Sequence, residues 1–420
     1  MDKPLKNHRE ISTLDSRDLR DHREIGAEQE LFYIDEDVGK GLAMWLPKGA
    51  TIRRILERYV TDLEVSEGYQ HVITPHVARL DLYKTSGHWE HYHDLMFPPM
   101  KRENEELVLR PMNCPHHIQV FKHKPRSYRE LPIRIAEFGT LYRWENSGEL
   151  SGLIRVRVMT LNDAHIFCSV KHLKEEFIRV VNLTKKVYGD LNFKDFWYRL
   201  SLHDPRDMEK YINNPKMWEM SERLLKEALK DAGVDYKEAI GEAAFYGPKL
   251  DVQVPNALGK DETVSTVQID FNLPEKFDVN FITEDGSKEK VVMIHRAIVS
   301  TLERMVGFLI EQYQGAFPTW LSPVQVVIIP ISEKHIEFAK KVSDTLVHAS
   351  IRVEVDERSE TMQSKIRDAQ IQKIPYMLIV GDKEEGENKV AVRTRGGENL
   401  GQMSLDEFSS KINSDIENKT

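Results

Sequence analysis

The residues best suited to chemistry share one face of a segment that is predicted to be a strand. In RVRVMTLNDAHIF, residues 155–167, side chains alternate between two faces of an extended chain. One face would then carry Arg155, Arg157, Met159, Leu161, Asp163 and His165. Two cations, a carboxylate and an imidazole are costly to bury unless they contact a ligand or one another. The face therefore predicts either a ligand site or a structural network of ion pairs.

A second charged pair lies just before this segment. Arg143 and Glu145 share a face at the end of LPIRIAEFGTLYRWE, residues 131–145, and NSGELSG is the turn that follows. The two segments are predicted to form an antiparallel hairpin, so their charged faces would combine. Arginine suits phosphate in such a site, because its planar guanidinium can hold two oxygens at once.

The chain has only two cysteines, Cys114 and Cys168, which excludes a disulfide framework. Cys114 lies between prolines and is followed by His116 and His117 in RPMNCPHH. In a reducing compartment, a cysteine near histidine is a metal ligand, a nucleophile or part of the core. Free cysteine is among the most buried residue types, so the residues alone favour a core thiol.

The elements that must position these residues form a mixed pattern of helices and strands. Apolar residues at helical spacing predict helices at 49–68, 170–190 and 215–232. Period-two alternation predicts strands at 69–77 (interrupted by Pro75), 131–145, 152–168, 238–254 and 264–273. The hairpin of 131–145 and 152–168 would therefore belong to a larger antiparallel sheet.

A different pattern begins after Trp320. Strands are predicted at 324–330, 351–356, 376–382 and 389–395, with helices at 333–349 and 361–372. Strands separated by helices imply parallel pairing with right-handed crossovers. The carboxy-terminal part is therefore predicted to be a small α/β domain.

Composition places the chain among folded proteins with more than one domain. Of its 420 residues, 40% are hydrophobic and 30% charged, and single cores stop growing near ~250 to 300 residues. The charged beginning lacks an apolar signal region, and no apolar run approaches the ~18 residues of a membrane span. A cytoplasmic protein with no membrane partner is expected. A net charge of −9 lowers the odds of nonspecific nucleic-acid binding but allows a local basic strip.

Several segments together resemble a known family. GYQHVITP resembles motif 1 of the class II aminoacyl-tRNA synthetases, LYRWE and the loop up to Arg155 resemble motif 2, and STLERM resembles motif 3. Within that class, RPMNCPHH, GLIRVRVMTLNDAHIF, GEAAFYGPKLDV, TVQIDF, MIHRAIVSTLERM and FPTWLSPVQV are similar to the threonyl-tRNA synthetase family. The likeness runs from about Leu19 to about Gln402.

The resemblance implies an α/β (α+β) fold with two domains. A charged tail, 1–18, would precede a class II catalytic domain with an antiparallel sheet, 19–320, and a small α/β anticodon-binding domain, 321–420. Family members with an amino-terminal editing domain are longer, so editing in cis is expected to be absent here. The helix before Pro75 matches the motif 1 dimer interface, which implies a homodimer with twofold symmetry.

The resemblance also implies the reaction and its cofactors. ATP would activate L-threonine to threonyl-adenylate, Mg²⁺ would accompany the ATP, and the threonyl group would pass to the 3′ end of tRNA(Thr). In this family one zinc ion per chain lies in the amino-acid pocket, and the matching ligands here are Cys114, His165 and His295. A catalytic zinc keeps three protein ligands and an open position. A site that binds the threonine hydroxyl rejects valine strongly but serine only weakly.

The same resemblance implies roles for individual residues. His116 and His117 are interpreted as supporting or structural, and Cys168 as core. The positions that match catalytic residues are Arg143, Arg304, Lys249 and His88, the last near the terminal ribose of the tRNA. The positions that match ATP-binding residues are Arg143, Glu145, Arg155, Met159, Gln268 and Arg304. The threonine-binding positions are Met112, Asp163 and Tyr246.

In the carboxy-terminal domain, Lys383 and Arg395 are the predicted anticodon contacts. Basic residues there are interleaved with acidic ones, so RNA recognition would depend on base-edge contacts more than on charge. Two alternatives remain: another class II enzyme such as the prolyl type, which would not need the Cys114, His165 and His295 set, and a synthetase-like paralogue that binds RNA without aminoacylating it.

Overall fold

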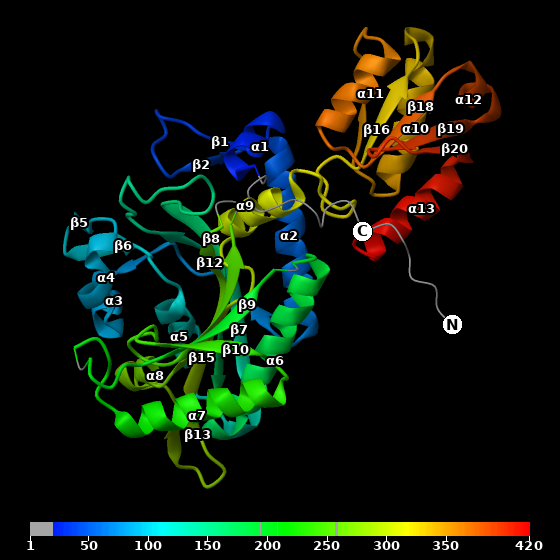
Figure 1. Cartoon of the computed structure of the whole chain (residues 1–420). Coiled ribbons are helices and arrows are strands. Elements are labelled where there is room, and N and C mark those ends of the chain that lie inside the picture. The colour runs from blue at the N-terminus through cyan, green and yellow to red at the C-terminus, as the bar shows by residue number, and fades with distance from the viewer. Residues whose placement is uncertain (1–19, 194, 208, 257–258) are drawn as a thin grey trace. The chain divides into compact units, whose positions relative to one another are not determined.

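The computed structural model describes residues 20–193, 195–207, 209–256 and 259–420. The predicted tail, 1–18, lies outside these residues. The described chain divides into two compact units, which are treated separately below. The first unit contains residues 34–43 and 57–307, and the second contains residues up to 33, 44–56 and 308–420. Figure 1 labels many of the elements of both units. The boundary predicted at residue 320 stays a prediction.

A large sheet is the framework of the first unit. Its strands are β3 Gln70–His71, β7 Ile133–Tyr142, β8 Val158–Cys168, β9 Trp197–Leu202, β10 Tyr236–Ile240, β11 Lys249–Pro255, β12 Asp261–Asp270 and β15 Val292–Ala297. They lie in the order β10-β9-β11-β12-β15-β8-β7-β3. The neighbouring strands from β9 to β7 are antiparallel to each other. At the two edges, β10 is parallel to β9 and β3 is parallel to β7. The predicted hairpin of β7 and β8 and the antiparallel sheet are confirmed.

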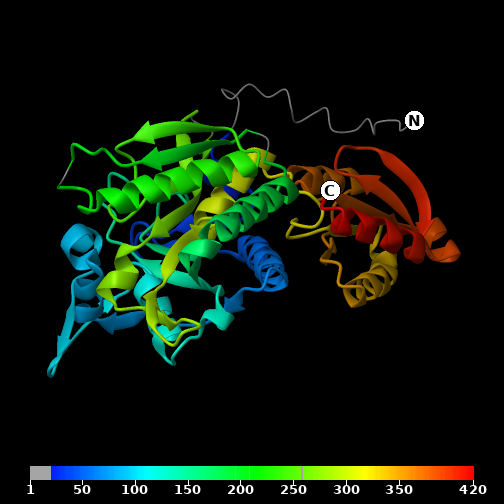
Figure 2. The ribbon, with the colours of Figure 1, turned by 90° about the horizontal axis from the view of Figure 1, so that it is seen from below.

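Helices cover one face of this sheet. They are α2 Pro47–Ser66, α6 Val170–Asp190 and α7 Pro215–Asp231. Helix α6 packs on β8, β12 and β15, and α6 and α7 pack against each other (Figure 2). Arg134 of β7 forms an ion pair with the buried Glu176 of α6 at 2.6 Å, and Asn162 of β8 donates to Glu64 of α2. Within the described residues, every helix is too short or too polar to cross a bilayer.

Shorter elements surround the opposite face. They are α3 Leu80–Ser86, α4 His88–Tyr92, α5 Cys114–Lys122, α8 Asn272–Lys276, the sheet of β4 Val77–Arg79, β6 Glu105–Leu109 and β5 Met100–Arg102, and the pair β13 Asn280–Ile282 and β14 Lys288–Lys290. Helix α9 Leu302–Tyr313 follows β15 in the chain and continues into the second unit at residue 308. Helix α5 begins at Cys114 and has proline in its first turn, where the missing N–H costs nothing. Cys114, Ile118 and Phe121 of α5 pack into a core with Ile133, Ile135 and Phe167 of the sheet.

Three strand predictions are wrong in their extent. The segment 69–77 forms only β3 at residues 70–71 and the first residue of β4, with no strand among the described residues between them. The segment 238–254 is not one strand, because the chain leaves β10 at Gly241, which has a φ of +88°, and resumes as β11 at Lys249. At Gly247 an added Cβ would lie 1.8 Å from the carbonyl oxygen of Ile269, so the chain passes close to β12. The segment 152–168 becomes a strand only at Val158, since Ser151 and Arg155 bridge across a turn.

The second unit contains a five-stranded sheet. Its strands are β16 Val326–Pro330, β17 Val353–Val355, β18 Tyr376–Val380, β19 Lys389–Thr394 and β20 Asn399–Ser404, in the order β17-β16-β18-β19-β20. The first three pair in parallel, as predicted from the intervening helices, and β19 and β20 add antiparallel strands. The helices that contact this sheet are α10 Ile336–His348, α11 Met362–Ile371, α12 Asp382–Glu387 and α13 Leu405–Glu417. Separate apolar clusters include Phe338 and Phe408, and Ile366 and Met377. The predicted small α/β domain is confirmed.

Candidate active site

Four predicted site residues form one row across the large sheet. Lys249 of β11 is in register with Gln268 of β12, Gln268 with His295 of β15, and His295 with His165 of β8. Residues in register on neighbouring strands point to the same face, with Cβ atoms ~4.5 to 5.5 Å apart. The sheet therefore brings together residues that are up to 130 positions apart in the sequence, and it does so through backbone pairing alone.

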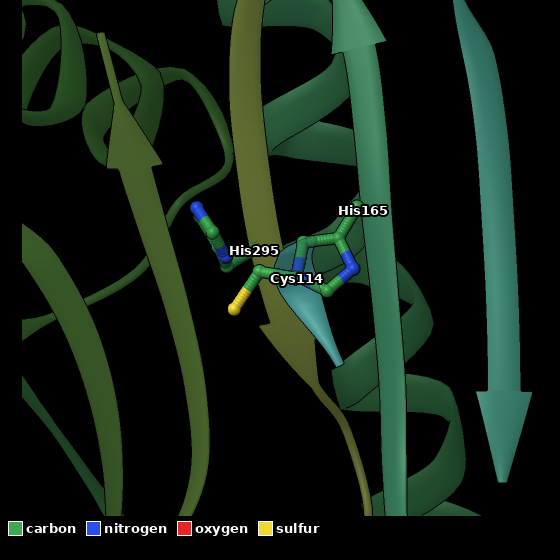
Figure 3. Close-up of side chains that lie close together, drawn as sticks. All are labelled: Cys114, His165 and His295. Carbon is green, nitrogen blue, oxygen red and sulfur yellow. The ribbon is translucent and has the colours of Figure 1, made fainter. Parts of the chain in front are cut away.

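Helix α5 adds a thiol to this row. The Sγ of Cys114 and one ring nitrogen each of His165 and His295 all lie within 4.8 Å of one another, and all three residues are buried. Figure 3 shows His165 on β8 and His295 on β15 with Cys114 beside them. The structure thus places the three predicted metal ligands in one cluster.

Hydrogen bonds leave one ring nitrogen of each histidine available for a ligand. The Nε2 of His295 lies 2.9 Å from Oδ2 of Asp270, so it donates to the carboxylate and Nδ1 keeps its lone pair. The Nδ1 of His165 lies 2.7 Å from Nδ1 of His117. The buried Nε2 of His165 has no hydrogen-bond partner among the described residues. An unpartnered buried nitrogen is costly, and a metal ion would satisfy it.

The protonation states of Cys114 and His165 are also compatible with the binding of a metal cation. Burial, aided by the carboxylates of Asp163 and Asp270, raises the pKa of the Cys114 thiol well above its ordinary value. Burial likewise lowers the pKa of His165 well below its ordinary value, so the ring is neutral. Neutral imidazole is the form that binds metals, and a thiolate here would need a cation to stabilise its charge. Cys–His–His sets are typical of zinc with an open fourth position, so the residues present fit zinc.

The predicted threonine-binding residues lie next to this cluster. The ring of Tyr246 is 5.5 Å from the ring of His295, and the Tyr246 hydroxyl donates to the side-chain carbonyl of Gln268. Oδ1 of Asp163 is 3.8 Å from Nε2 of His165, and its other oxygen has no hydrogen-bond partner among the described residues. Met112 precedes the helix that carries Cys114 and contacts Arg143. Tyrosine, carboxylate and metal ligands together suit a small polar ligand with an amine.

The predicted phosphate-binding arginines lie near one another. Burial lowers the pKa of the Arg143 guanidinium, and Glu145 opposes this effect. Burial also lowers the pKa of Arg304, and the nearby charges of Arg143 and Arg155 act in the same direction. The Nε of Arg155 is 3.6 Å from Glu145, and its side chain is half exposed. Neighbouring cations that repel one another are stabilised by an anion, and a polyphosphate would supply it.

Lys249, His88 and Met159 complete the predicted set. The Nζ of Lys249 is 3.0 Å from the buried carboxylate of Asp251. His88 is buried, and its Nδ1 lies 2.7 Å from the Ser86 hydroxyl. Burial, together with the charges of His295 and Arg143, lowers the pKa of His88 to about 3, so this ring is neutral. Met159 is buried in a small apolar cluster with Leu141 and Val156, and Met112 is partly buried against these residues.

The predicted anticodon residues belong to the second unit and have different surroundings. Lys383 is exposed in α12. Arg395 is partly buried and donates to the carbonyl oxygens of Phe317 and Lys373. These bonds give Arg395 a structural role of its own. Its contact with RNA stays a prediction.

Several residues around the site were not predicted from the sequence. Asp270 orients His295, and Glu137 of β7 lies 3.2 Å from His117, which in turn contacts His165. Asn113 is fully buried, yet its amide has no hydrogen-bond partner in the described part of the chain. For Glu137, strand parity offered a signal: it is in register with Asp163, so it shares the face that carries His165.

The fold and the site agree with family comparisons. Residues 96–313 match the tRNA synthetase class II core domain (G, H, P, S and T), and residues 325–415 match an anticodon binding domain. The chain therefore belongs to the class II aminoacyl-tRNA synthetases, and the predicted fold class is confirmed.

The relatives within that class are threonine enzymes. The chain is 58% identical over 412 residues to threonine–tRNA ligase of Geobacillus kaustophilus and 60% identical over 398 residues to that of Geobacillus sp. strain WCH70. These alignments cover 98% and 94% of this chain, but only 63% and 62% of the relatives. A solved structure described as the RNA binding domain of threonyl-tRNA synthetase from Cryptosporidium parvum Iowa II is 38% identical, with a TM-score of 0.89 and coverage of 94% of this chain and 98% of that one.

Proposed function

We propose that this chain activates L-threonine with ATP and transfers it to the 3′ end of tRNA(Thr). The observation that carries the proposal is the buried cluster of Cys114, His165 and His295 within a class II core. The names of the relatives support threonine as the amino acid. A non-aminoacylating paralogue would not need to keep this cluster together with Arg143 and Arg304.

The amino-acid pocket would hold zinc through Cys114, His165 and His295. When bound, zinc with an open coordination position can bind the amine and the side-chain hydroxyl of threonine. Tyr246 and Asp163 border the same space, and an oxygen of the Asp163 side chain, whose pKa is raised by burial, would accept a hydrogen bond from the amine of the substrate. Valine lacks the hydroxyl and would be rejected by several orders of magnitude, whereas serine lacks only a methyl group, worth ~1 to 3 kcal/mol.

Adenylate formation would depend on positioning and on charge neutralisation. A carboxylate oxygen of threonine attacks the α-phosphorus of ATP, the bond between the α-phosphorus and the α,β-bridging oxygen breaks, and pyrophosphate leaves with Mg²⁺. Arg143 would stabilise the charge on the α-phosphate, and Arg155 and Arg304 would hold the leaving phosphates. Lys249 lies one strand from Gln268 and would neutralise the reacting carboxylate. Glu145 would accept from the adenine amine, and Met159 would pack on its ring.

Transfer to tRNA would use the same pocket. A ribose hydroxyl of the terminal adenosine attacks the threonyl carbonyl, and AMP leaves. His88 is neutral because its pKa is low, and a neutral imidazole near that ribose could hold the hydroxyl in place. The second unit would contact the anticodon through Lys383 and Arg395. A homodimer is proposed, in which the segment around Pro75 contacts a second copy.

Pyrophosphate exchange with threonine, serine and valine tests the proposal. The purified chain is assayed before and after zinc removal with a chelator, and again after zinc is restored. We expect exchange with threonine that disappears with the metal and returns with it, weak exchange with serine, and none with valine.

The outcomes separate the alternatives. No exchange with any amino acid in metal-replete protein would reject the enzyme and favour an RNA-binding paralogue. Exchange with threonine that is unaffected by complete zinc removal would retain the enzyme and reject zinc as the selecting group.

A further inference from the structure

A continuous chain of hydrogen bonds leads from the metal cluster to the edge of the sheet. Nδ1 of His165 lies 2.7 Å from Nδ1 of His117, and Nε2 of His117 lies 3.2 Å from Oε2 of Glu137. Glu137 also accepts from the Thr74 hydroxyl at 2.7 Å and from the Thr74 backbone N–H at 3.1 Å. All four residues are buried.

The charge at the far end of this chain is held in place by a cation. Arg110 is 1% exposed; it donates to Oε1 of Glu137 at 3.1 Å and to the Thr74 hydroxyl at 2.6 Å. Burial alone would raise the pKa of Glu137, but hydrogen bonds from His117 and Thr74 and the charge of Arg110 outweigh burial and lower it to about 2. Glu137 is therefore a carboxylate, which accepts hydrogen bonds and donates none.

With a neutral His117 ring, the direction of each proton in the chain follows from that carboxylate. His117 must donate from Nε2 to Glu137, so in the neutral ring its Nδ1 is an acceptor. His165 must then donate from Nδ1 to His117, and its Nε2 carries the lone pair. That nitrogen has no hydrogen-bond partner among the described residues, and His165 shares a buried cluster with Cys114 and His295. The opposite order of protons would place a hydrogen on Nε2 of His165 and prevent it from binding a metal.

We propose that Glu137 and His117 are positioning residues that hold His165 in the tautomer and ring orientation required of a metal ligand. This inference rests on the zinc site of the proposed function. Outer partners of metal-bound histidines fix the tautomer and raise the basicity of the ligand, and their loss typically costs about 10- to 100-fold in metal affinity. Asp270 has the same relation to His295 directly, whereas Glu137 reaches His165 through a second imidazole.

Glu137→Gln tests the direction of the protons with almost no change in volume. The amide oxygen is expected on the side of Oε1, where Arg110 and the Thr74 N–H both donate. The amide NH₂ would then face Nε2 of His117 and require that nitrogen to accept. His117 would turn its proton toward His165, and Nε2 of His165 would become protonated.

His117→Phe is the second variant, because it removes the relay but keeps a ring of similar size. His116→Phe is its matched control. His116 is the neighbouring buried histidine on the same helix, and its Nδ1 approaches the Tyr83 hydroxyl at 3.4 Å, outside the chain described above. Zinc affinity is measured for each folded protein by competition with a chromophoric chelator. Visible absorption of the cobalt-substituted proteins reports on the coordination geometry.

We expect zinc to bind about 10- to 100-fold more weakly to E137Q and H117F, with altered cobalt spectra, and H116F to remain within about threefold of the original protein. A purely structural role would lower the thermal stability of the zinc-free variants and leave affinity and spectrum unchanged, which would overturn the inference. If E137Q does not fold, H117F and its control decide. If the original protein binds no stoichiometric zinc, the proposed zinc site itself fails, and this result is distinguishable from equal affinity in all variants.

Discussion

Arg143 illustrates how a single residue is prepared for an anion. Its Nε donates to the carbonyl oxygen of Pro111 at 3.3 Å, and its Nη2 contacts the sulfur of Met112. A carbonyl and a thioether are neutral and weak partners compared with a carboxylate. Burial has the largest effect on the pKa of Arg143 and lowers it, and the charge of Glu145 opposes this effect only in part. The guanidinium is therefore partly desolvated, and a phosphate group would be a much better partner.

Arg143→Gln should lower the rate of threonine-dependent pyrophosphate exchange by about 100- to 1,000-fold, as expected when a positioned donor to a developing charge is lost. The glutamine keeps a neutral donor but removes the charge. Zinc content and thermal unfolding should remain close to those of the original protein. Arg79→Gln is the control, because Arg79 forms an exposed pair with Glu105 and should retain activity within about twofold. A loss below tenfold in R143Q would contradict the proposed role at the α-phosphate.

At the residue scale, the sequence predicted which face of β8 carries the site but not how the site is held. Alternation placed Met159, Asp163 and His165 together, and the structure agrees. The alternation predicted no role for the other face of β8, where Asn162 forms hydrogen bonds with Glu64 and Arg296. The family resemblance, and not the alternation, identified Cys114 and His295 as partners of His165 in a metal site. His117 was already interpreted as supporting or structural, whereas Asp270 and Glu137 became visible as supports only when backbone pairing had placed them.

At the scale of elements, a buried ion pair joins the long helix α2 to the central strands. Nη1 of Arg296, on β15, is 2.6 Å from Oε1 of Glu64 and 3.2 Å from Oδ1 of Asn162 on β8. The guanidinium also lies 4.3 Å from the ring centroid of Tyr69. Arg296 follows the predicted ligand His295 and points to the opposite face. The pair therefore anchors β15 from behind the cluster.

Arg296→Met should destabilise the first unit by about 3 to 5 kcal/mol, because it leaves the buried Glu64 carboxylate without the guanidinium and with only the imidazole of His71, 2.9 Å away, as a basic partner. The double variant E64L/R296M should recover most of this loss, since an apolar pair of similar volume removes both charges. The measurement is urea unfolding of the zinc-free proteins. Arg58→Met, which removes an exposed pair with Asp62 in the same helix, should change stability by less than about 1 kcal/mol. Equal effects of R296M and R58M would contradict the anchoring role.

The sequence predicted long periodic elements well and short ones poorly. The amphipathic helices α2, α6 and α7 and the hairpin of β7 and β8 are present near their predicted positions. The division of 238–254 escaped prediction because Gly241 and Gly247 break a segment that still alternates in hydrophobicity. Elements such as α4 and α8, with five residues each, have too few positions for a period to show. Their conformation depends on tertiary contacts.

At the scale of the whole molecule, an exposed apolar segment supports the proposed homodimer. Ile73 is 96% exposed, and Val77, at the start of β4, is 38% exposed. A hollow of about 430 Å³ lies next to them, lined by Thr74, Pro75, His116, Gln119, Val120, His123 and Arg126. An exposed apolar segment beside a hollow is the kind of surface that a second copy of the chain would cover.

Ile73→Asp should convert the proposed dimer into a monomer. Each dimer would lose two buried isoleucines, worth about 1.5 to 3 kcal/mol apiece, so the dissociation constant should rise by at least about 100-fold. A twofold axis would also bring the two new carboxylates toward the same interface, where like charges repel. Ile240→Asp is the control, because Ile240 is 67% exposed on the edge strand β10 and lies outside the segment around Pro75. Sedimentation equilibrium should show a dimer for the original protein and I240D, and a monomer for I73D. A monomeric original protein would reject the dimer, whereas a dimeric I73D would place the interface elsewhere on the chain.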